Sequence, residues 1–206
     1  EKVVLGGWSG GGSLSLFYQD QAQTPTITHT PAGDEVDLVG AGLQPADGVL
    51  LLAAHISRSV TMTEWLDPSI LDEARPFERD PSLNLYDPAF PETAPYSDAF
   101  VQRFRQAQID RNRRITAWAK AQLAELKAAG DPDAERCFVV QGTMSDVRWT
   151  DPTQDPSDRR PHTCYLGDPK IVNDGPVGLG RFTTLRSWLS QWSYDESRAN
   201  GVVNAG

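Results

Sequence analysis

The residues that decide the fold lie between Val3 and Phe17 and read VVLGGWSGGGSLSLF. The stretch begins with a short, continuous apolar run, which is typical of a parallel strand covered on both faces. After the glycines, the sequence from Ser13 to Gln19 predicts a helix. The pentapeptide Gly7–Gly11 therefore places a G-x-S-x-G pattern between a strand and a helix.

The serine of this pattern, Ser9, is predicted to stand on a sharp strand-to-helix turn with a strained backbone. The residues two before and two after it, Gly7 and Gly11, are expected to approach each other closely, so that neither can carry a large side chain. The turn would present the Ser9 hydroxyl at the carboxyl end of the sheet. The N–H of Gly10, at the helix N-terminus, would donate to a developing oxyanion. We therefore predict that Ser9 and Gly10 are catalytic.

One other interpretation of the glycines stays open, and a second is excluded. They can form a merely flexible turn, because G-x-S-x-G arises by chance in loops rich in Gly and Ser. A phosphate-binding loop does not fit, because no Lys followed by Ser or Thr comes after the glycines and no G-x-G-x-x-G fingerprint is present.

A second apolar run, from Val49 to Ala54, predicts a second buried strand and completes a βαβ unit. His55 follows it, at the end of the sheet where sites form in open α/β folds. We predict that His55 and Trp8 are substrate-binding residues. For all three histidines (His29, His55 and His162) a hydrogen-bonded or solvent-exposed ring is favoured over a general base.

From residue 59 onward the sequence is rich in turn signals. Asp-Pro occurs seven times, and each copy predicts a turn or the start of a helix. Residues 76–96 predict an ordered loop, and Ser97 is expected to cap a long helix that runs to about Lys127 and stops at Gly130. The helix carries five arginines, which are predicted to form a solvated face: Arg103, Arg105, Arg111, Arg113 and Arg114.

Towards the end of the chain, the sequence predicts a strand from Cys137 to Val140 and a final helix from about Leu179 to Tyr194. The helix carries an apolar stripe that predicts core packing rather than ligand binding: Leu185, Trp188, Leu189 and Trp192. Cys137 and Cys164 are interpreted as reduced thiols in a cytoplasmic protein, with a single disulfide as the alternative.

Composition excludes several classes of partner. The 206 residues carry a formal net charge of −9, which repels phosphate backbones and makes nucleic acid an improbable partner. No apolar run approaches the length of a membrane span, so no membrane association is expected. No group of His, Cys, Asp or Glu has metal-ligand spacing, so neither a metal nor a cofactor is expected.

Residues Val3–Gly12 resemble the nucleophile elbow of the α/β-hydrolase superfamily. The stretches Glu64–Pro68 and Leu185–Asp195 are more loosely similar to bacterial members with a large lid insertion. The resemblance implies an α/β fold: a partial α/β-hydrolase core of strand, elbow, helix and strand in residues 1–58, a mainly helical lid in 59–175 placed above Ser9, and a helix returning to the core in 176–206. It also implies that earlier strands lie before Glu1, and that the triad acid and histidine follow Gly206.

The function that this resemblance implies is that of an esterase-like serine hydrolase, which cleaves an ester, lactone or amide through an acyl-enzyme on Ser9. Its partners would be a small-molecule acyl substrate and the remaining segments of the fold, from the same polypeptide or from a completing chain. Two alternatives stay open: a non-catalytic binding module or inactive remnant, and acyl transfer or cofactor-free peroxidation on the same elbow.

Overall fold

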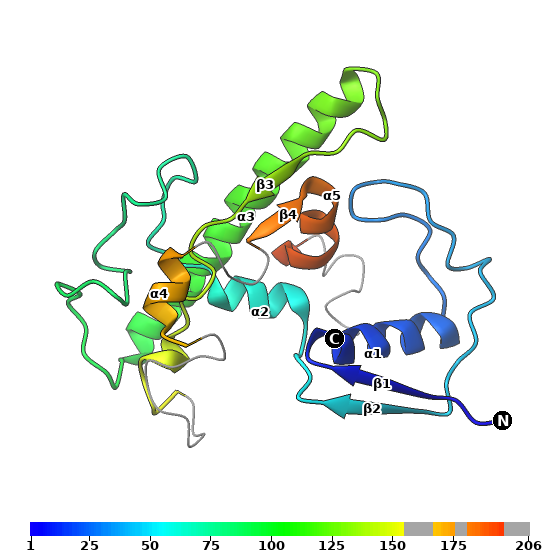
Figure 1. Cartoon of the computed structure of the whole chain (residues 1–206), viewed down its shortest axis with the longest axis horizontal. Helices are drawn as coiled ribbons and strands as arrows, with labels where there is room; N and C mark the ends of the chain where they lie inside the picture. The colour runs from blue at the N-terminus through cyan, green and yellow to red at the C-terminus, as the bar shows by residue number, and fades with distance from the viewer. Residues whose placement is uncertain (155–166, 176–180, 196–206) are drawn as a thin grey trace. The chain divides into compact units, whose positions relative to one another are not determined.

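A computed structural model of the chain describes residues 1–154, 167–175 and 181–195 (Figure 1). It is a mixed α/β structure with a short parallel β-α-β unit and a long helix. The chain divides into two compact units, which are described separately below. The first comprises Glu1–Thr61, Trp118–Arg136 and Thr184–Gly206, and the second comprises Met62–Ala117 and Cys137–Thr183.

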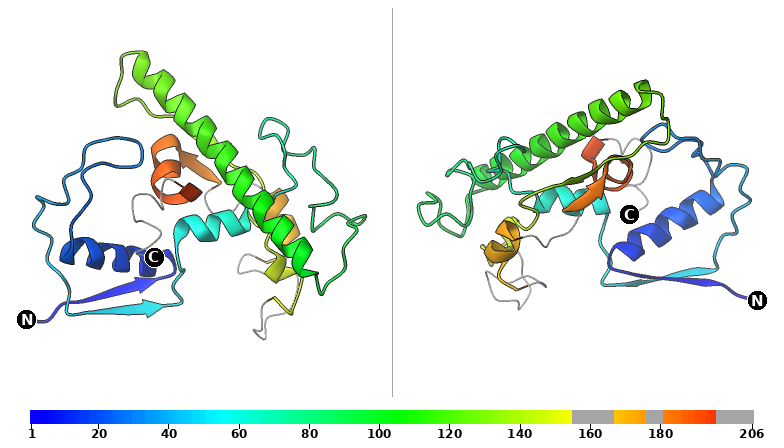
Figure 2. Two further views of the ribbon diagram at one scale, coloured as in Figure 1. Left: turned by 180° about the vertical axis from the view of Figure 1, so that it is seen from behind. Right: turned by 45° about the horizontal axis from the view of Figure 1, so that its top comes forward.

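The first unit contains the predicted strand, helix and strand. β1 (Val4–Trp8) leads into α1 (Gly10–Gln23), and β2 (Gly48–Leu52) pairs with β1 in parallel. The register runs from Val4 opposite Gly48 to Trp8 opposite Leu52, so the two strands end side by side. α1 lies along one face of the strand pair in all the views (Figures 1 and 2). The predicted βαβ unit is confirmed.

The prediction that both strands are buried is wrong for this chain. Val4 is 63% exposed, and Leu50, Leu51 and Leu52 are each about half exposed. Within the described part of the chain, β1 has β2 as its sole strand partner. A two-stranded sheet with a helix on one side has too few neighbours to cover apolar side chains on both faces.

The first unit also holds the residues of the predicted final helix. They form α5 (Leu185–Ser187) and a π-helical turn, η2 (Trp188–Trp192). The predicted apolar stripe is core, because all four of its side chains are buried. The helix begins later than predicted, since β4 (Phe182–Thr184) precedes it and the hydroxyl of Thr184 caps it by accepting from Ser187 N–H. Residues 179–180 lie outside the described residues.

The long helix α3 (Asp98–Ala128) matches its prediction closely. Ser97 caps it, with its hydroxyl oxygen 3.2 Å from the N–H of Phe100. Gly130 follows the helix with a φ of 96°, a left-handed conformation that glycine adopts without steric penalty. The helix therefore begins after a capping serine and ends before a glycine in the left-handed conformation, as the sequence predicts.

The Asp-Pro pairs form turns, as predicted. In all six pairs that the structure describes, Oδ1 of the aspartate accepts from the backbone N–H two residues later. The six aspartates are Asp67, Asp80, Asp87, Asp131, Asp151 and Asp168. The last of these caps α4 (Pro169–Asp174), and Asp155 lies outside the described residues.

The second unit has an aromatic core. Tyr96, Phe100 and Phe104 are buried together, with neighbouring ring centroids 5.0 and 5.7 Å apart. Trp65, at the end of α2 (Arg58–Trp65), packs against Trp149 of η1 (Val147–Trp149) at 5.2 Å. These aromatic residues therefore pack among themselves.

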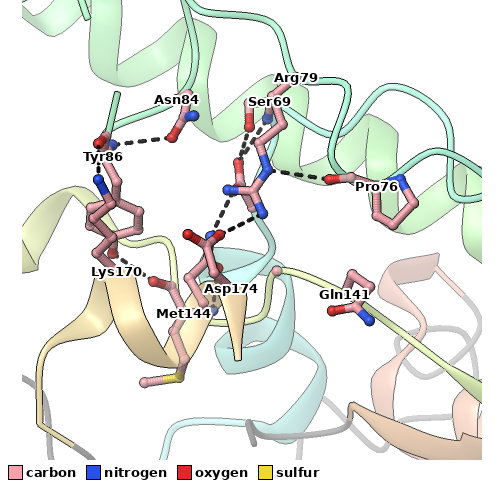
Figure 3. A network of polar contacts seen from close by, with 12 residues as sticks. Ser69, Pro76, Arg79, Asn84, Tyr86, Gln141, Met144, Lys170 and Asp174 are labelled. Atoms are coloured by element: carbon pink, nitrogen blue, oxygen red, sulfur yellow. Dashed lines mark hydrogen bonds and ion pairs between the residues drawn. The ribbon is translucent and has the colours of Figure 1, made fainter. Parts of the chain in front are cut away.

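A buried polar network crosses the second unit (Figure 3). Arg79 forms ion pairs with the buried carboxylate of Asp67 at 3.2 Å and with Asp174 at 2.8 Å. Asn173 donates to Asp67 at 2.7 Å. The guanidinium of Arg111 is fully buried, where it donates to the carbonyl oxygens of Asp67 and Gly142.

The predicted solvated arginine face is therefore wrong at Arg111, because backbone carbonyls and the carboxylate of Glu73 replace water around its side chain. The short sheet of β3 (Cys137–Val139) and β4 agrees with the strand predicted from Cys137. Cys137 is an exposed free thiol, and Cys164 lies outside the described residues. Among the described residues, no helix is long and apolar enough to cross a membrane.

Candidate active site

The backbone at Ser9 has the conformation predicted for an elbow. Its φ is 54° and its ψ is −125°, a region that non-glycine residues adopt at a cost of about 1–3 kcal/mol. Ser9 stands between the last residue of β1 and the first residue of α1. Such a residue keeps this conformation because the surrounding structure holds it there, and strain of this kind gathers at functional sites.

The glycines around Ser9 make the turn sterically possible. A Cβ on Gly7 would lie 2.3 Å from the carbonyl oxygen of Gly11, so Gly7 allows the start of α1 to approach β1 as predicted. A Cβ on Gly11 would meet nothing within 4 Å, so the prediction that Gly11 must stay small is wrong. The second crowded position is Gly12, whose Cβ would lie 2.3 Å from the Cβ of Ala54.

The ends of β1 and β2 are joined at the elbow by backbone hydrogen bonds. Ser9 N–H donates to the carbonyl of Leu52 at 3.0 Å, and His55 N–H donates to the carbonyl of Ser9 at 3.1 Å. Between these two bonds, Ala53 has a φ of 45°, in the left-handed region that L-residues rarely adopt. This tight turn after β2 carries His55 to the elbow.

The side chains of Ser9 and His55 form a hydrogen bond. Oγ of Ser9 lies 3.1 Å from Nε2 of His55, and both residues are half-buried. This distance is within the range in which a base takes a proton from a nucleophile. The sequence prediction placed His55 near the substrate, and the structure places it against the predicted nucleophile.

Partial burial lowers the pKa of His55 below its ordinary value of 6.5, and the positive charge of Arg58 lowers it further. The imidazole is therefore neutral at pH 7, and a neutral imidazole is the form that accepts a proton. Arg58 is the first residue of α2, which begins with a hydrogen bond from Val60 N–H to the hydroxyl of Ser57.

The guanidinium of Arg58 lies beside the elbow. Its Nε is 3.1 Å from the position that a Cβ on Gly10 would occupy. Its NH1 donates to the side-chain oxygen of Gln191 at 2.7 Å, and its Cζ lies 5.9 Å from the ring centroid of Trp192. Arg58 is thus held on one side by η2 and faces Gly10 on the other.

A cavity of about 490 Å³ adjoins Arg58 within the first unit. Its apolar wall comes from α1 and the following loop: Leu14, Phe17, Ile27, Pro31, Val36 and Leu38. Its polar lining includes Ser13, Arg58, Ser190 and Gln191. Asp34 anchors the loop, because its carboxylate accepts from Arg186 at 2.9 Å and lies 3.5 Å from the ammonium of Lys127.

The other predicted site residues lie as follows. Trp8 ends β1 with 74% of its surface exposed and does not line the cavity. His29 is exposed, contacts the hydroxyl of Thr28 at 3.0 Å and contributes to the cavity wall. His162 lies outside the described residues. Among the described residues, no three His, Cys, Asp or Glu side chains form a group that could hold a metal ion.

Neither the contact of His55 with Ser9 nor the position of Arg58 beside Gly10 was predicted from the sequence. The signal for His55 was present, because the ends of paired parallel strands meet at one edge of the sheet and both residues directly follow such ends. Arg58 had no comparable signal, since its position depends on α2, which the sequence pattern does not reveal.

Comparison of the chain with protein-family models, with curated proteins and with solved structures found no match.

Proposed function

We propose that this chain carries the nucleophile of a serine hydrolase that cleaves a carboxylic ester, lactone or amide. The observation that supports the proposal most is the hydrogen bond of 3.1 Å between Oγ of Ser9 and Nε2 of His55 at a backbone-strained serine. A strained serine, a neutral imidazole within proton-transfer distance and a helix N-terminus together form the parts of an acyl-transfer site.

The reaction would proceed in two stages. Nε2 of His55 takes the proton of the Ser9 hydroxyl while Oγ attacks the substrate carbonyl, and the carbonyl oxygen becomes negatively charged. The N–H of Gly10, in the first turn of α1, has no partner within the helix and donates to that oxygen. His55 then protonates the leaving alcohol or amine. Water, activated by the same imidazole, hydrolyses the acyl-enzyme.

We infer further that the βαβ unit is part of an α/β-hydrolase core that strands from outside residues 1–206 complete. The apolar, half-exposed side chains of β1 and β2 support this inference, as does the edge of β1 that no described strand pairs with. Parallel sheets are normally covered on both faces. In this proposal His55 takes the role that the resemblance gives to a histidine after Gly206, and the triad acid would lie in the part of the core outside residues 1–206. Residues 59–175 would serve as the lid of the site.

Active-site labelling tests the proposal. The natural protein that carries this chain, with any polypeptide that copurifies with it, is treated with a fluorophosphonate, and the adduct is mapped by mass spectrometry. We expect the adduct on Ser9, with no labelling in Ser9→Ala and at least a hundredfold slower labelling in His55→Gln, given the usual contribution of a general base. The matched control is His29→Gln, which should label at the rate of the unmodified protein.

An adduct on another serine, or hydrolysis that survives Ser9→Ala, would show that the assignment is wrong. A well-folded natural protein that neither labels nor hydrolyses esters would favour the inactive remnant instead.

A further inference from the structure

Arg58 places a fixed positive charge at the elbow. Gln191 and Trp192 hold its guanidinium from one side, and its Nε and NH2 lie 3.1 and 3.4 Å from the Cβ position of Gly10. Among the described residues, no carboxylate lies within ion-pair distance of Arg58. By contrast, Arg79, Arg105, Arg111 and Arg148 all pair with acids. Arg58 is therefore oriented by neutral groups, and its charge is available to an anion from outside.

This charge opposes the chemistry of a neutral substrate. His55 becomes positively charged when it accepts the Ser9 proton, and Arg58 already disfavours the charged imidazole. An anion paired with Arg58 would remove that repulsion while it is bound. A substrate that brings its own negative charge to Arg58 would therefore both bind more tightly and react faster than a neutral one.

The lining of the cavity next to Arg58 indicates the polarity of the rest of such a substrate. The polar part of the lining includes Arg58 and also Ser13, which lies one turn after Gly10 on α1 and donates to the carbonyl of Gly10. Much of the wall is apolar, from Phe17, Ile27, Val36 and Leu38 among others, although His29 and Thr30 also line it. A volume of about 490 Å³ lies in the range typical of small-molecule pockets. A polar end and an apolar body suit an amphipathic ligand.

We propose that Arg58 is a specificity-determining residue that binds a carboxylate on the substrate, close to the scissile carbonyl, while an apolar chain of the same acyl group occupies the cavity. This inference rests on the proposed function and defines its substrate class as esters or amides of alkyl-substituted dicarboxylic acids. Ser9 attacks one carbonyl, and Arg58 holds the second, ionised carboxyl group by charge-assisted hydrogen bonds.

A pair of isosteric esters tests the inference in the natural protein. Ethyl 3-carboxynonanoate carries the carboxylate and a hexyl chain, and ethyl 3-carbamoylnonanoate replaces the carboxylate with a neutral amide. We expect kcat/KM to be about 10–100-fold higher for the carboxylate, the range of a charge-assisted hydrogen bond. Arg58→Gln should abolish this preference, because the carboxylate loses its partner while the carbamoyl ester loses only the repulsion between Arg58 and the charged imidazole, and Arg58→Lys should retain part of it.

The control is Arg103→Gln, the same substitution at an exposed arginine, which should leave the preference intact. Equal rates for the two esters in the unmodified protein would overturn the inference. So would an Arg58→Gln variant that loses both activities equally, because Arg58 would then act on the oxyanion or on the fold.

A binding measurement separates failure of this inference from failure of the proposed function. Calorimetric titration with octanoate and octanamide requires no chemistry at Ser9. If Ser9 proves unreactive but octanoate binds in an Arg58-dependent way and octanamide does not, the carboxylate site stands and the hydrolase proposal falls. If Ser9 hydrolyses neutral esters and octanoate does not bind, only the carboxylate site is wrong.

Discussion

At the scale of single residues, the elbow depends on which glycines are crowded. A Cβ on Gly7 would overlap the backbone of α1 and a Cβ on Gly12 would overlap Ala54, just after β2, whereas Gly11 has open space around its Cβ position. The motif predicts the position of the turn and its strained serine, because G-x-S-x-G has a fixed geometry. It does not predict which glycine is crowded, because that depends on how α1 and Ala54 pack.

We expect Gly7→Ala to destroy the site, because the new methyl group would overlap the carbonyl of Gly11 and move α1 away from β1. Labelling of Ser9 by a fluorophosphonate should fall at least tenfold, and the free energy of unfolding should fall by about 1–3 kcal/mol. Gly11→Ala is the matched control. It should label normally and be as stable or slightly more so, since alanine favours helix over glycine by about 1 kcal/mol. Equal effects of the two substitutions would contradict the packing described here.

The pH dependence of labelling should report His55. Its pKa lies below 6.5 in the folded protein, so the neutral base persists and the labelling rate should reach half its maximum below pH 6.5. Arg58→Gln removes a positive charge and should move this midpoint upward, towards 6.5. His55→Gln should abolish the acidic limb, and His29→Gln should leave it in place. A midpoint at or above 6.5 in the unmodified protein would show that the imidazole is not in the environment described.

The lowered pKa of His55 also makes the stability of the fold depend on pH. Between the lowered pKa of folded His55 and 6.5, the unfolded chain binds more protons than the folded one. The contribution of His55 to the free energy of unfolding therefore falls as the pH drops below 6.5, and it is constant above that window. In His55→Gln this part of the pH dependence should disappear from denaturant unfolding curves.

At the scale of secondary structure elements, polar groups define boundaries and connections. The caps of α3 and the Asp-Pro turns could be predicted from sequence, because each depends on a side chain and the backbone next to it. The burial of Arg111 and the β4 strand could not, since both depend on residues distant in sequence. In this part of the chain, hydrogen bonds between a side chain and the adjacent backbone were thus easier to predict than burial or strand pairing.

Among the residues that connect secondary structure elements, Asp67 is the one whose substitution should lower the stability of the fold most. Its buried carboxylate pairs with Arg79 and accepts from Asn173, linking the turn after α2 to α4. Asp67→Asn should lower the free energy of unfolding by about 1–3 kcal/mol, because it weakens the hydrogen bonding of the buried Arg79 side chain while the pair with Asp174 remains. The control is Asp72→Asn, which breaks an exposed pair with Arg75 and should cost less than about 1 kcal/mol. Similar losses in denaturant unfolding would show that the network is not buried as described.

At the scale of the whole molecule, the main question is what covers the apolar side chains of the β1–β2 sheet. Leu51 faces α1, since its Cδ2 lies 3.5 Å from the Cβ position of Gly12. Side chains alternate along a strand, so Leu50 and Leu52 face the other side. Within the first unit, no described segment covers that side (Figure 2). The sequence predicted apolar, central strands, because the apolar runs are local features, but what covers each face depends on long-range packing that the pattern does not specify.

A comparison of two leucines tests whether the natural protein covers this face. Leu50 is 54% exposed and Leu71, in a loop, is 58% exposed. If further strands and helices complete the sheet, Leu50→Ala should lower the free energy of unfolding of the natural protein by about 2–5 kcal/mol, the usual range for a core leucine. Leu71→Ala should change it by less than about 0.5 kcal/mol. Small effects at both positions would mean that Leu50 faces solvent and that the sheet is not extended.

The strained serine has an evolutionary consequence. At a φ of 54°, glycine would relieve a backbone penalty that every other residue bears, so Ser9→Gly should make the fold more stable while it removes the nucleophile. A lineage released from selection for chemistry could gain stability at this position by a substitution at a single codon. If related proteins keep a serine in that conformation beside a histidine, they are expected to be under selection for turnover.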